Sequence, residues 1–291
     1  MKNVAVVTDS NSGITQNQAK NYGLFVIPMP FTIDGEPYLE DINLTQEEFY
    51  EKLLNDCDIS TSQPSPGAVT ELWDDLLKEY DELVYIPMSS GLSASCQTAS
   101  VLAAEYGGKV QVVNNQRISV TLKCSVLDAL TMAKSGKEAL QIKEYLETVK
   151  FDSSIYITVN NLKYLKRGGR VTPAGAAIGT LLQIKPVLQI HGEKLDAFAK
   201  ARGMTQARTI MKDAIRRDLD TRFKEFASPE KIWLQMAYTF DKEQAEDFKS
   251  EMEADFPGFD IDMAPLSLSI SCHIGPGALA VGCTKKSYAN L

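Results

Sequence analysis

Three side chains that could bind a small anion or take part in catalysis stand out in the sequence. Ser93 lies in the run SSGLSAS (89–95), Thr61 lies in the run STSQPSPG (60–67), and His273 directly precedes Ile-Gly-Pro-Gly. Hydroxyl groups donate hydrogen bonds, whereas a carboxylate only accepts them, so hydroxyls on a loop stiffened by proline would suit a carboxylate. The competing interpretation is structural, because serines and threonines of this kind often cap helices.

The elements around Ser93 favour an anion site. An apolar run over 83–88 has the length and composition of a buried strand, and the Ala-, Ser- and Leu-rich residues from 94 to 106 contain neither Gly nor Pro, which is typical of a helix. The serines would then fill the turn from a strand into a helix, with Ser93 at or beside the N-cap. The first amides of a helix have no internal partner and carry partial positive charge, so they attract anions.

The remaining pattern predicts an α/β protein with two α/β domains, residues 1–153 and 154–291. Strands alternate with helices in the first part, which favours a mainly parallel sheet flanked by helices. Asp9 follows the first strand (4–7) and is expected to anchor its loop by accepting backbone amides. A hairpin turn is expected at 33–36.

The second domain is expected to be smaller, with a mixed sheet. A short basic helix is predicted over 162–170 and an apolar, small-residue helix over 174–182. Strands at 232–238 and 261–265 should flank a helix at 242–255.

Composition excludes several classes of protein. The 291 residues carry a formal net charge of -8, which argues against nucleic acid as the main partner. No apolar run reaches the length of a membrane span, and the first residues lack a signal-peptide pattern. The five cysteines are scattered and contain no C-x-x-C, which favours reduced thiols in a cytoplasmic protein. No cofactor or metal is expected.

Several motifs in a fixed order give the chain a family resemblance. They are TDS (8–10), TSQP (61–64), SSGLS (89–93), NLKYLKRGGR (161–170), KP (185–186), RG (202–203) and HIGPGA (273–278). On these motifs the sequence resembles the DegV family, bacterial fatty-acid-binding proteins that act as the acyl-carrying subunit of a two-component fatty acid kinase. Two departures from the family pattern are Gly13, where an acidic residue is frequent, and Ala94-Ser95, where Gly-Thr is frequent.

The resemblance implies a long-chain fatty acid in a tunnel between the two domains. Its carboxylate would be bound by Thr61 and Ser93, with His273 close by. Ser62 and Leu92 are expected to add contacts to the head group or its loop.

The resemblance also implies a partner. The chain would not be an enzyme itself and would present the acid to a separate, ATP-dependent kinase subunit. Arg170 and Arg202, two cations beside glycine turns, are expected to serve that encounter. Solvated charges at helix ends are the competing interpretation for both.

Two other functions are weighed against this one. A serine hydrolase would use Ser93 and His273, since GLSAS (91–95) is similar to the G-x-S-x-G turn that precedes a helix. The second glycine is missing, and no acidic residue is clearly placed for a triad. A nucleotide or sugar-phosphate binder would need a P-loop or G-x-G-x-x-G after a strand, and the sequence contains neither.

Overall fold

The computed structural model describes residues 2–55, 57–178, 184–192 and 194–286. The described residues form two compact units that divide between Lys150 and Phe151. The boundary expected from the sequence, between residues 153 and 154, falls inside the first strand of the second unit, β8 (Ser153–Thr158).

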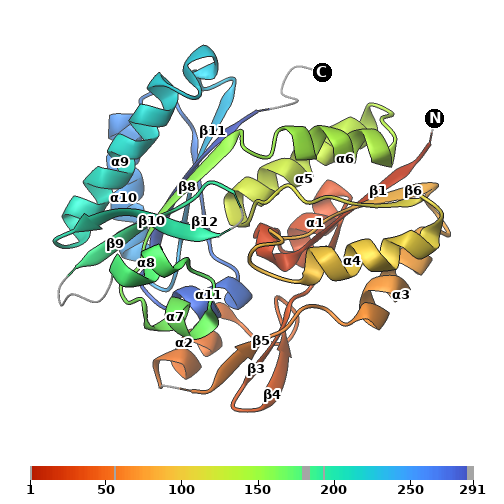
Figure 1. Cartoon of the computed structure of the whole chain (residues 1–291), viewed down its shortest axis with the longest axis horizontal. Helices are drawn as coiled ribbons and strands as arrows, with labels where there is room; N and C mark the ends of the chain where they lie inside the picture. Colours follow the sequence, from red (N-terminus) through yellow and green to blue (C-terminus); the bar gives the residue numbers. More distant parts are fainter. Residues whose placement is uncertain (1, 56, 179–183, 193, 287–291) are drawn as a thin grey trace. The chain divides into compact units, whose positions relative to one another are not determined.

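The first unit is built on a parallel sheet of four strands in the order β2-β1-β6-β7. The strands are β1 (Val4–Asp9), β2 (Phe25–Ile27), β6 (Glu82–Ile86) and β7 (Val110–Val112). The helices are α1 (Gln16–Tyr22), α2 (Gln46–Leu54), α3 (Pro66–Leu76), α4 (Ser95–Ala103), α5 (Ser119–Lys134) and α6 (Ala139–Thr148). This is the helix-flanked parallel sheet that the sequence predicts (Figure 1).

Both faces of the parallel sheet are covered, which is why all six residues of β1 are buried. On one face α3 and α4 pack on the sheet, with the fully buried Trp73 ring 5.8 Å from the Tyr85 ring. The α5 and α6 helices contact β1, β6 and β7 on the other face. Side chains alternate along a strand, so a strand buried on both sides reads as a continuous apolar run.

A small antiparallel sheet completes the first unit, in the order β4-β3-β5. Its strands are β3 (Pro30–Ile33), β4 (Glu36–Leu39) and β5 (Ile59–Thr61). The hairpin turn predicted at 33–36 is confirmed, with Asp34 and Gly35 both at positive φ, as the twist of a two-residue hairpin requires. The prediction of a loop at Thr61 was wrong, because Thr61 is the last residue of β5 and pairs with Phe31.

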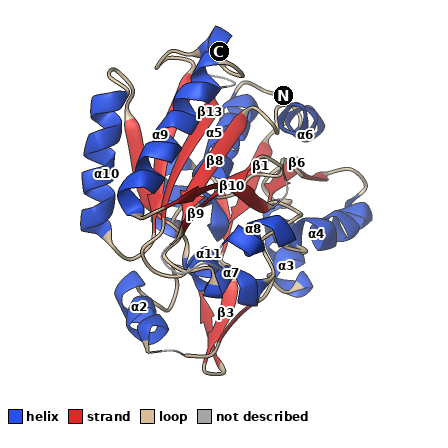
Figure 2. Cartoon of the chain, turned by 60° about the vertical axis from the view of Figure 1, so that its left-hand side comes forward, coloured by secondary structure: helices blue, strands red, loops and turns tan. Residues whose placement is uncertain are grey.

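The second unit contains a mixed six-stranded sheet, as predicted, in the order β10-β9-β8-β13-β11-β12. Among these described strands, only the neighbours β11 and β12 run parallel. Besides β8, the strands are β9 (Lys185–Ile190), β10 (Leu195–Ala201), β11 (Ile232–Tyr238), β12 (Ile261–Pro265) and β13 (Leu279–Lys285). Figure 2 shows these strands in red.

Two long helices, α9 (Met204–Asp220) and α10 (Lys242–Asp255), pack on this sheet around buried side chains such as Met211 and Phe248. Three short helices are α7 (Lys163–Gly168), α8 (Pro173–Ile178) and α11 (Leu268–Ile274). The small-residue helix predicted over 174–182 corresponds to α8, and residues 179–182 lie outside the described ones. Within the described ranges, none of the helices has both the length and the apolarity needed to cross a bilayer.

Candidate functional site

Asp9 organises the carboxyl edge of the parallel sheet. Its side chain is fully buried, and one carboxylate oxygen accepts the Asn11 amide at 3.0 Å while the other accepts the Met88 amide at 2.9 Å. The loop after β1 is therefore tied to the start of the Ser89–Ser95 loop, and the predicted anchoring role of Asp9 is confirmed. Burial raises the pKa of Asp9 to about 6, although the two amides act in the opposite direction.

Ser93 lies one residue further from α4 than an N-cap would. The N-cap of α4 is Ala94, which already has helical dihedral angles and contributes no side-chain cap. Of the two expected positions, at the N-cap or next to it, the structure therefore places Ser93 next to the N-cap. The Ser93 hydroxyl accepts the Ser95 amide at 3.2 Å and shares a short hydrogen bond with the Ser95 hydroxyl. It is half-buried, at the first amide of α4.

The backbone of the Ser89–Ser95 loop is fixed by its own turn and by the loop after β7. The amides of Leu92 and Ser93 both donate to the Ser89 carbonyl, at 3.0 and 3.2 Å. The Ser89 amide donates to the Arg117 carbonyl at 2.9 Å. Leu92 is buried within this turn, so the structure gives it a packing role in the loop.

Arg117 is a positioning residue that sequence reasoning missed. Its guanidinium is buried, and it donates to the Val149 carbonyl at 2.6 Å and the Ser125 hydroxyl at 3.0 Å. A buried charge must be hydrogen-bonded in this way, and the bonds hold the Arg117 backbone against the Ser89–Ser95 loop. Only an arginine within the otherwise uncharged run VVNNQRISV (112–120) could have drawn attention to it.

Thr61 and Ser62 reach the neighbourhood of α4 through the segment that follows them. The Ser62 amide donates to the Pro30 carbonyl at 3.1 Å, which extends the β3–β5 ladder by one residue. The Thr98 hydroxyl of α4 then donates to the side chain of Gln63 at 3.0 Å. Ser65, not Thr61, caps α3 by accepting the Ala68 amide, so Thr61 is not required as a helix cap.

His273 lies in the second unit, in the last turn of α11, and not in a loop as predicted. It packs directly against the end of α7, because a Cβ on Gly168 would overlap the His273 Nδ1 atom. A Cβ on Gly275 would likewise overlap the Tyr164 ring. The glycines of the NLKYLKRGGR and HIGPGA motifs therefore allow α7 and α11 to approach closely.

The Gly-Pro-Gly loop after α11 is fixed by a buried threonine that sequence reasoning also missed. The Thr239 hydroxyl donates to the Gly275 carbonyl at 2.7 Å and accepts the Ala278 amide at 2.8 Å. A Cβ on Gly277 would overlap the Asn160 side-chain nitrogen, and Gly277 has a φ of 77°. No nearby sequence pattern links Thr239 to a loop so much later in the chain, so only the fold reveals the contact.

Burial lowers the pKa of His273 to about 4, and the positive charge of Arg170 acts in the same direction. At neutral pH the imidazole is uncharged and offers one N–H donor. The Arg170 guanidinium donates to the Gly168 carbonyl, and a Gly168 Cβ would meet His273, so Arg170 and His273 approach the same turn of α7.

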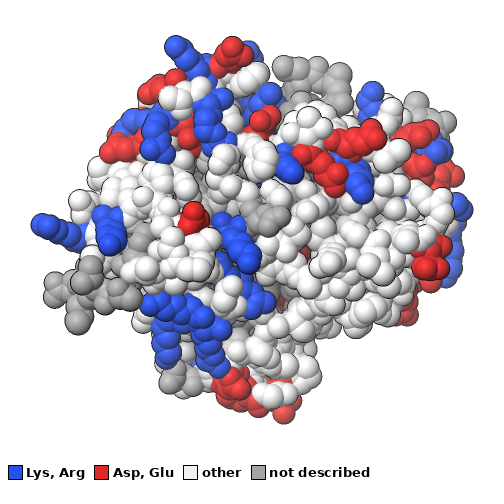
Figure 3. Space-filling model, viewed as in Figure 1, with Lys and Arg blue, Asp and Glu red and all other residues white. Residues whose placement is uncertain are grey.

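Cations gather around α7. Lys163, Lys166 and Arg167 are exposed on this helix, and we call them the α7 basic surface. Figure 3 shows the blue side chains over the position of α7 in Figure 1. Arg202 is also exposed and follows the end of β10, where its amide donates to the Gln206 side chain at 2.6 Å.

The hydrolase interpretation gains no support from the geometry of Ser93. The nucleophile of a G-x-S-x-G turn sits on a strained backbone, whereas Ser93 is not among the described residues with positive φ. Within the described ranges, no cluster of His, Cys, Asp or Glu could hold a metal ion.

Comparison with known proteins identifies the family. The family model described as "Uncharacterised protein, DegV family" matches residues 3–286. A DegV domain-containing protein of Deinococcus radiodurans is 32% identical over 215 residues, which cover 74% of this chain and 76% of that protein. The chain therefore belongs to the DegV family.

Two solved structures share the fold over nearly the whole chain. A DegV family protein from Thermus thermophilus, described as fatty acid binding, superposes with a TM-score of 0.88 at 28% identity, covering 98% of this chain and 100% of that one. DegV from Bacillus subtilis, described as a fatty acid binding protein, gives a TM-score of 0.86 at 27% identity with the same coverage. The family resemblance inferred from the motifs is confirmed.

Proposed function

We propose that this protein binds a long-chain fatty acid, with the carboxylate accepting hydrogen bonds from Ser93 and Thr61 and with His273 close to the head group. The observation that carries the proposal is the Ser93 hydroxyl at the first amide of α4, in a chain whose structural relatives are described as fatty acid binding. The half-buried side chains of Ser93 and Thr61 belong to two anchored segments. Ser62 would contact the head group beside Thr61, and Leu92 would support the loop.

The head group and the tail of the acid are expected to contribute differently to the binding free energy. A hydrogen bond to a charged group contributes about 1.5–3 kcal/mol, and each buried methylene contributes about 0.8 kcal/mol. A chain of about sixteen carbons therefore supplies most of the gross binding free energy, from which the cost of association is subtracted. The hydroxyls would fix the orientation of the acid and discriminate against neutral lipids.

We further propose that the bound acid is presented to a separate, ATP-dependent kinase subunit that forms the acyl phosphate. Arg202 and the α7 basic surface support this step, since they are exposed cations on an acidic chain. Arg170 was expected to serve the same encounter. Its guanidinium donates to the Gly168 carbonyl near His273, so Arg170 would be equally well placed to contact the head group.

The experiment that tests the proposal compares Ser93→Ala with the wild type. Lipid extracted from the purified protein should contain a long-chain fatty acid. Ser93→Ala should lower fatty acid affinity about tenfold or more without abolishing binding, because one charge-assisted bond is lost and the tail contacts remain. It should slow acyl phosphorylation at saturating lipid by a larger factor, because a misplaced carboxylate is not in line with the phosphoryl donor.

Ser100→Ala is the matched control, since Ser100 lies on the same helix and its hydroxyl donates to the Cys96 carbonyl of that helix. It should bind fatty acid as the wild type does. The proposal is overturned if Ser93→Ala binds as tightly as Ser100→Ala, or if the purified protein takes up no fatty acid. Covalent labelling of Ser93 by a fluorophosphonate would instead indicate the hydrolase.

A further inference from the structure

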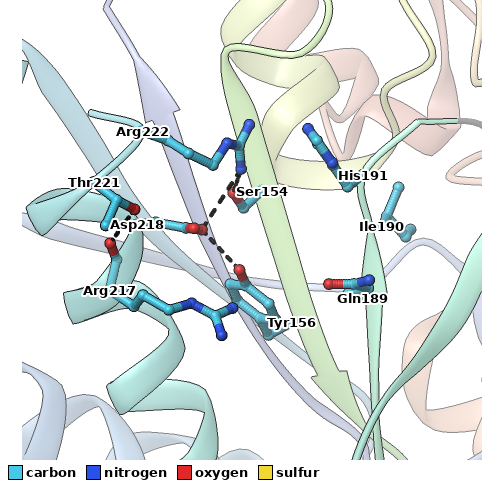
Figure 4. A pocket seen from close by; sticks show the side chains of 9 residues that line it. All are labelled: Ser154, Tyr156, Gln189, Ile190, His191, Arg217, Asp218, Thr221 and Arg222. Carbon is cyan, nitrogen blue, oxygen red and sulfur yellow. Dashed lines mark hydrogen bonds and ion pairs between the residues drawn. The ribbon is translucent and has the colours of Figure 1, made fainter. Parts of the chain in front are cut away.

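A polar cavity of about 190 Å³ lies within the second unit, where α9 ends beside β8 and β9 (Figure 4). Side chains from α9 and the segment after it form one side, and side chains from β9 and the residue after it form the other, with β8 between them. The lining consists of Ser154, Tyr156, Gln189, Ile190, His191, Arg217, Asp218, Thr221 and Arg222. The proposed head-group residues are not part of this lining.

The negative charge in the cavity is already compensated. Asp218 is 2% exposed, and its carboxylate accepts the Tyr156 hydroxyl at 2.8 Å. The Arg222 guanidinium lies 3.8 Å from the same carboxylate oxygen. Burial and the Asp218 charge raise the pKa of Tyr156 to about 12, although Arg217 acts in the opposite direction, so Tyr156 remains a donor to Asp218 at neutral pH.

Besides contributing a positive charge, Arg222 connects two segments of the second unit. It donates to the Ser154 hydroxyl at 2.6 Å and to the Phe151 carbonyl at 2.6 Å, which ties the segment after α9 to the start of β8. Its guanidinium is thereby fixed at the edge of the cavity. The rigid placement keeps a positive charge there without a mobile side chain having to be ordered.

Three other polar groups of the lining are left with unused hydrogen-bonding capacity. The Arg217 guanidinium interacts with the Tyr156 hydroxyl and lies 5.2 Å from the Phe198 ring centre, and no carboxylate among the described residues forms an ion pair with it, so most of its five N–H donors remain unused. The Gln189 amide and the His191 imidazole make no side-chain hydrogen bond to the described part of the chain, although the His191 ring lies edge-on to Phe151 at 5.6 Å. Donors that the protein holds in place and leaves partly unused are available to a ligand.

We propose that this cavity binds a small oxyanion, carried by a phosphate or carboxylate group, through Arg217, Gln189 and His191. Two arginines face one compensated carboxylate, so the local charge favours an anion. Guanidinium and amide donors match the oxygens of such a group. The volume is below that of a pocket for a large ligand, and the lining is polar, so an acyl chain is excluded.

The two histidines of the chain provide a direct test by NMR. Inorganic phosphate titrated into the purified protein should shift the His191 ring signals saturably, at about 10 mM or less, and leave those of His273 unchanged. Burial and the charge of Arg222 lower the pKa of His191, and a bound anion should raise it again, because it favours the imidazolium form. Acetate titrated in the same way distinguishes a carboxylate site from a phosphate site.

Arg217→Gln should weaken the anion response about tenfold or more, because Arg217 is the cation of the described lining that no carboxylate compensates. Lys224→Gln removes the same charge from an exposed residue that follows the lining residue Arg222 in the sequence but does not line the cavity, and it should leave the response unchanged. Gln189→Leu provides a second variant should Arg217→Gln fail to fold, and it should also weaken binding.

The proposal is overturned if neither anion shifts His191 saturably, or if Arg217→Gln responds as Lys224→Gln does. In the phosphate titration, a parallel shift of His191 and His273 would indicate a general salt effect and overturn the proposal as well, whereas acetate is also expected to reach the proposed head-group site beside His273. Fatty acid binding does not enter these outcomes, so the test stands apart from the proposed lipid function.

Discussion

At the scale of single residues, Asp9 combines full burial with two backbone amides from different segments. A buried carboxylate that accepts amides from the loops after β1 and β6 fixes the start of the Ser89–Ser95 loop. Burial away from water makes the ionised carboxylate less favourable than the protonated one, which is why the pKa of Asp9 is raised from 3.8 to about 6. Asp9 thus links the stability of the first unit to pH.

The pH dependence has a definite sign. Because the pKa of Asp9 is higher in the folded protein than in the unfolded chain, the folded state holds the proton more tightly. The stabilisation from Asp9 protonation is complete below a pH of about 3.8 and is lost as the pH rises through about 6. The melting temperature of the wild type minus that of Asp9→Asn should therefore decrease over this interval, as measured by thermal unfolding in a series of buffers.

Asp81→Asn is the matched control, since Asp81 is an exposed carboxylate of the same unit that accepts the Asn3 amide. A difference for Asp9→Asn that stays constant with pH, or that increases toward pH 6, would contradict the assigned shift.

At the scale of elements, local sequence patterns predict most of this fold. The limits of α10, β11 and β12 agree with the sequence-based ranges, because these elements have clear periodicity and flanking polar turns. The α11 helix was missed, since its serine-rich run has a low intrinsic helix propensity and ends in Gly-Pro-Gly. Ser267 begins this helix by capping the Ile270 amide, and packing against α7 supplies the rest.

The candidate site was predictable in part for a similar reason. Asp9 ends one buried strand and Ser93 lies in the loop after another, so their location at a sheet edge can be deduced from the chain. Arg117 and Thr239 act on segments distant in sequence, and their contacts exist only once the fold has formed. The proximity of His273 to α7 likewise depends on a glycine far earlier in the chain.

The contact between α7 and α11 can be tested through Gly168. Alanine at this helical position would favour the helix by about 1 kcal/mol, but its Cβ would overlap the His273 ring. Overpacking of this kind costs about 1–3 kcal/mol. Gly168→Ala should therefore lower thermal stability and shift the NMR signals of His273.

Gly67→Ala serves as the control, since Gly67 lies in α3 and a Cβ added there would have no other atom within 4 Å. It should leave stability unchanged or raise it by up to about 1 kcal/mol. Equal effects of the two substitutions would show that α7 and α11 do not depend on the close approach at Gly168.

At the scale of the whole molecule, the distribution of charge departs from the average composition. The chain is acidic overall, yet the exposed side chains of α7 include three cations and no acidic residue lies within that helix. Figure 3 shows few charged side chains over the position of α4 in Figure 1. A cationic region on an acidic protein accelerates the encounter with an acidic partner surface and matters less for folding.

Arg202 offers the clearest test of such an encounter. It is exposed, and its backbone amide holds the local turn, so its side chain can be changed with little effect on β10 or α9. Arg202→Glu should slow acyl phosphorylation by an ATP-dependent fatty acid kinase subunit at low ionic strength, while fatty acid affinity stays within about twofold of the wild type. The slowing should diminish as salt is added, because screening weakens the repulsion that the substitution introduces.

Lys20→Glu, the same reversal on an exposed residue of α1, controls for net charge and should leave the rate near that of the wild type. Equal rates for Arg202→Glu and Lys20→Glu would remove Arg202 from the kinase encounter, and a parallel loss of lipid binding would assign it to the fold of the second unit.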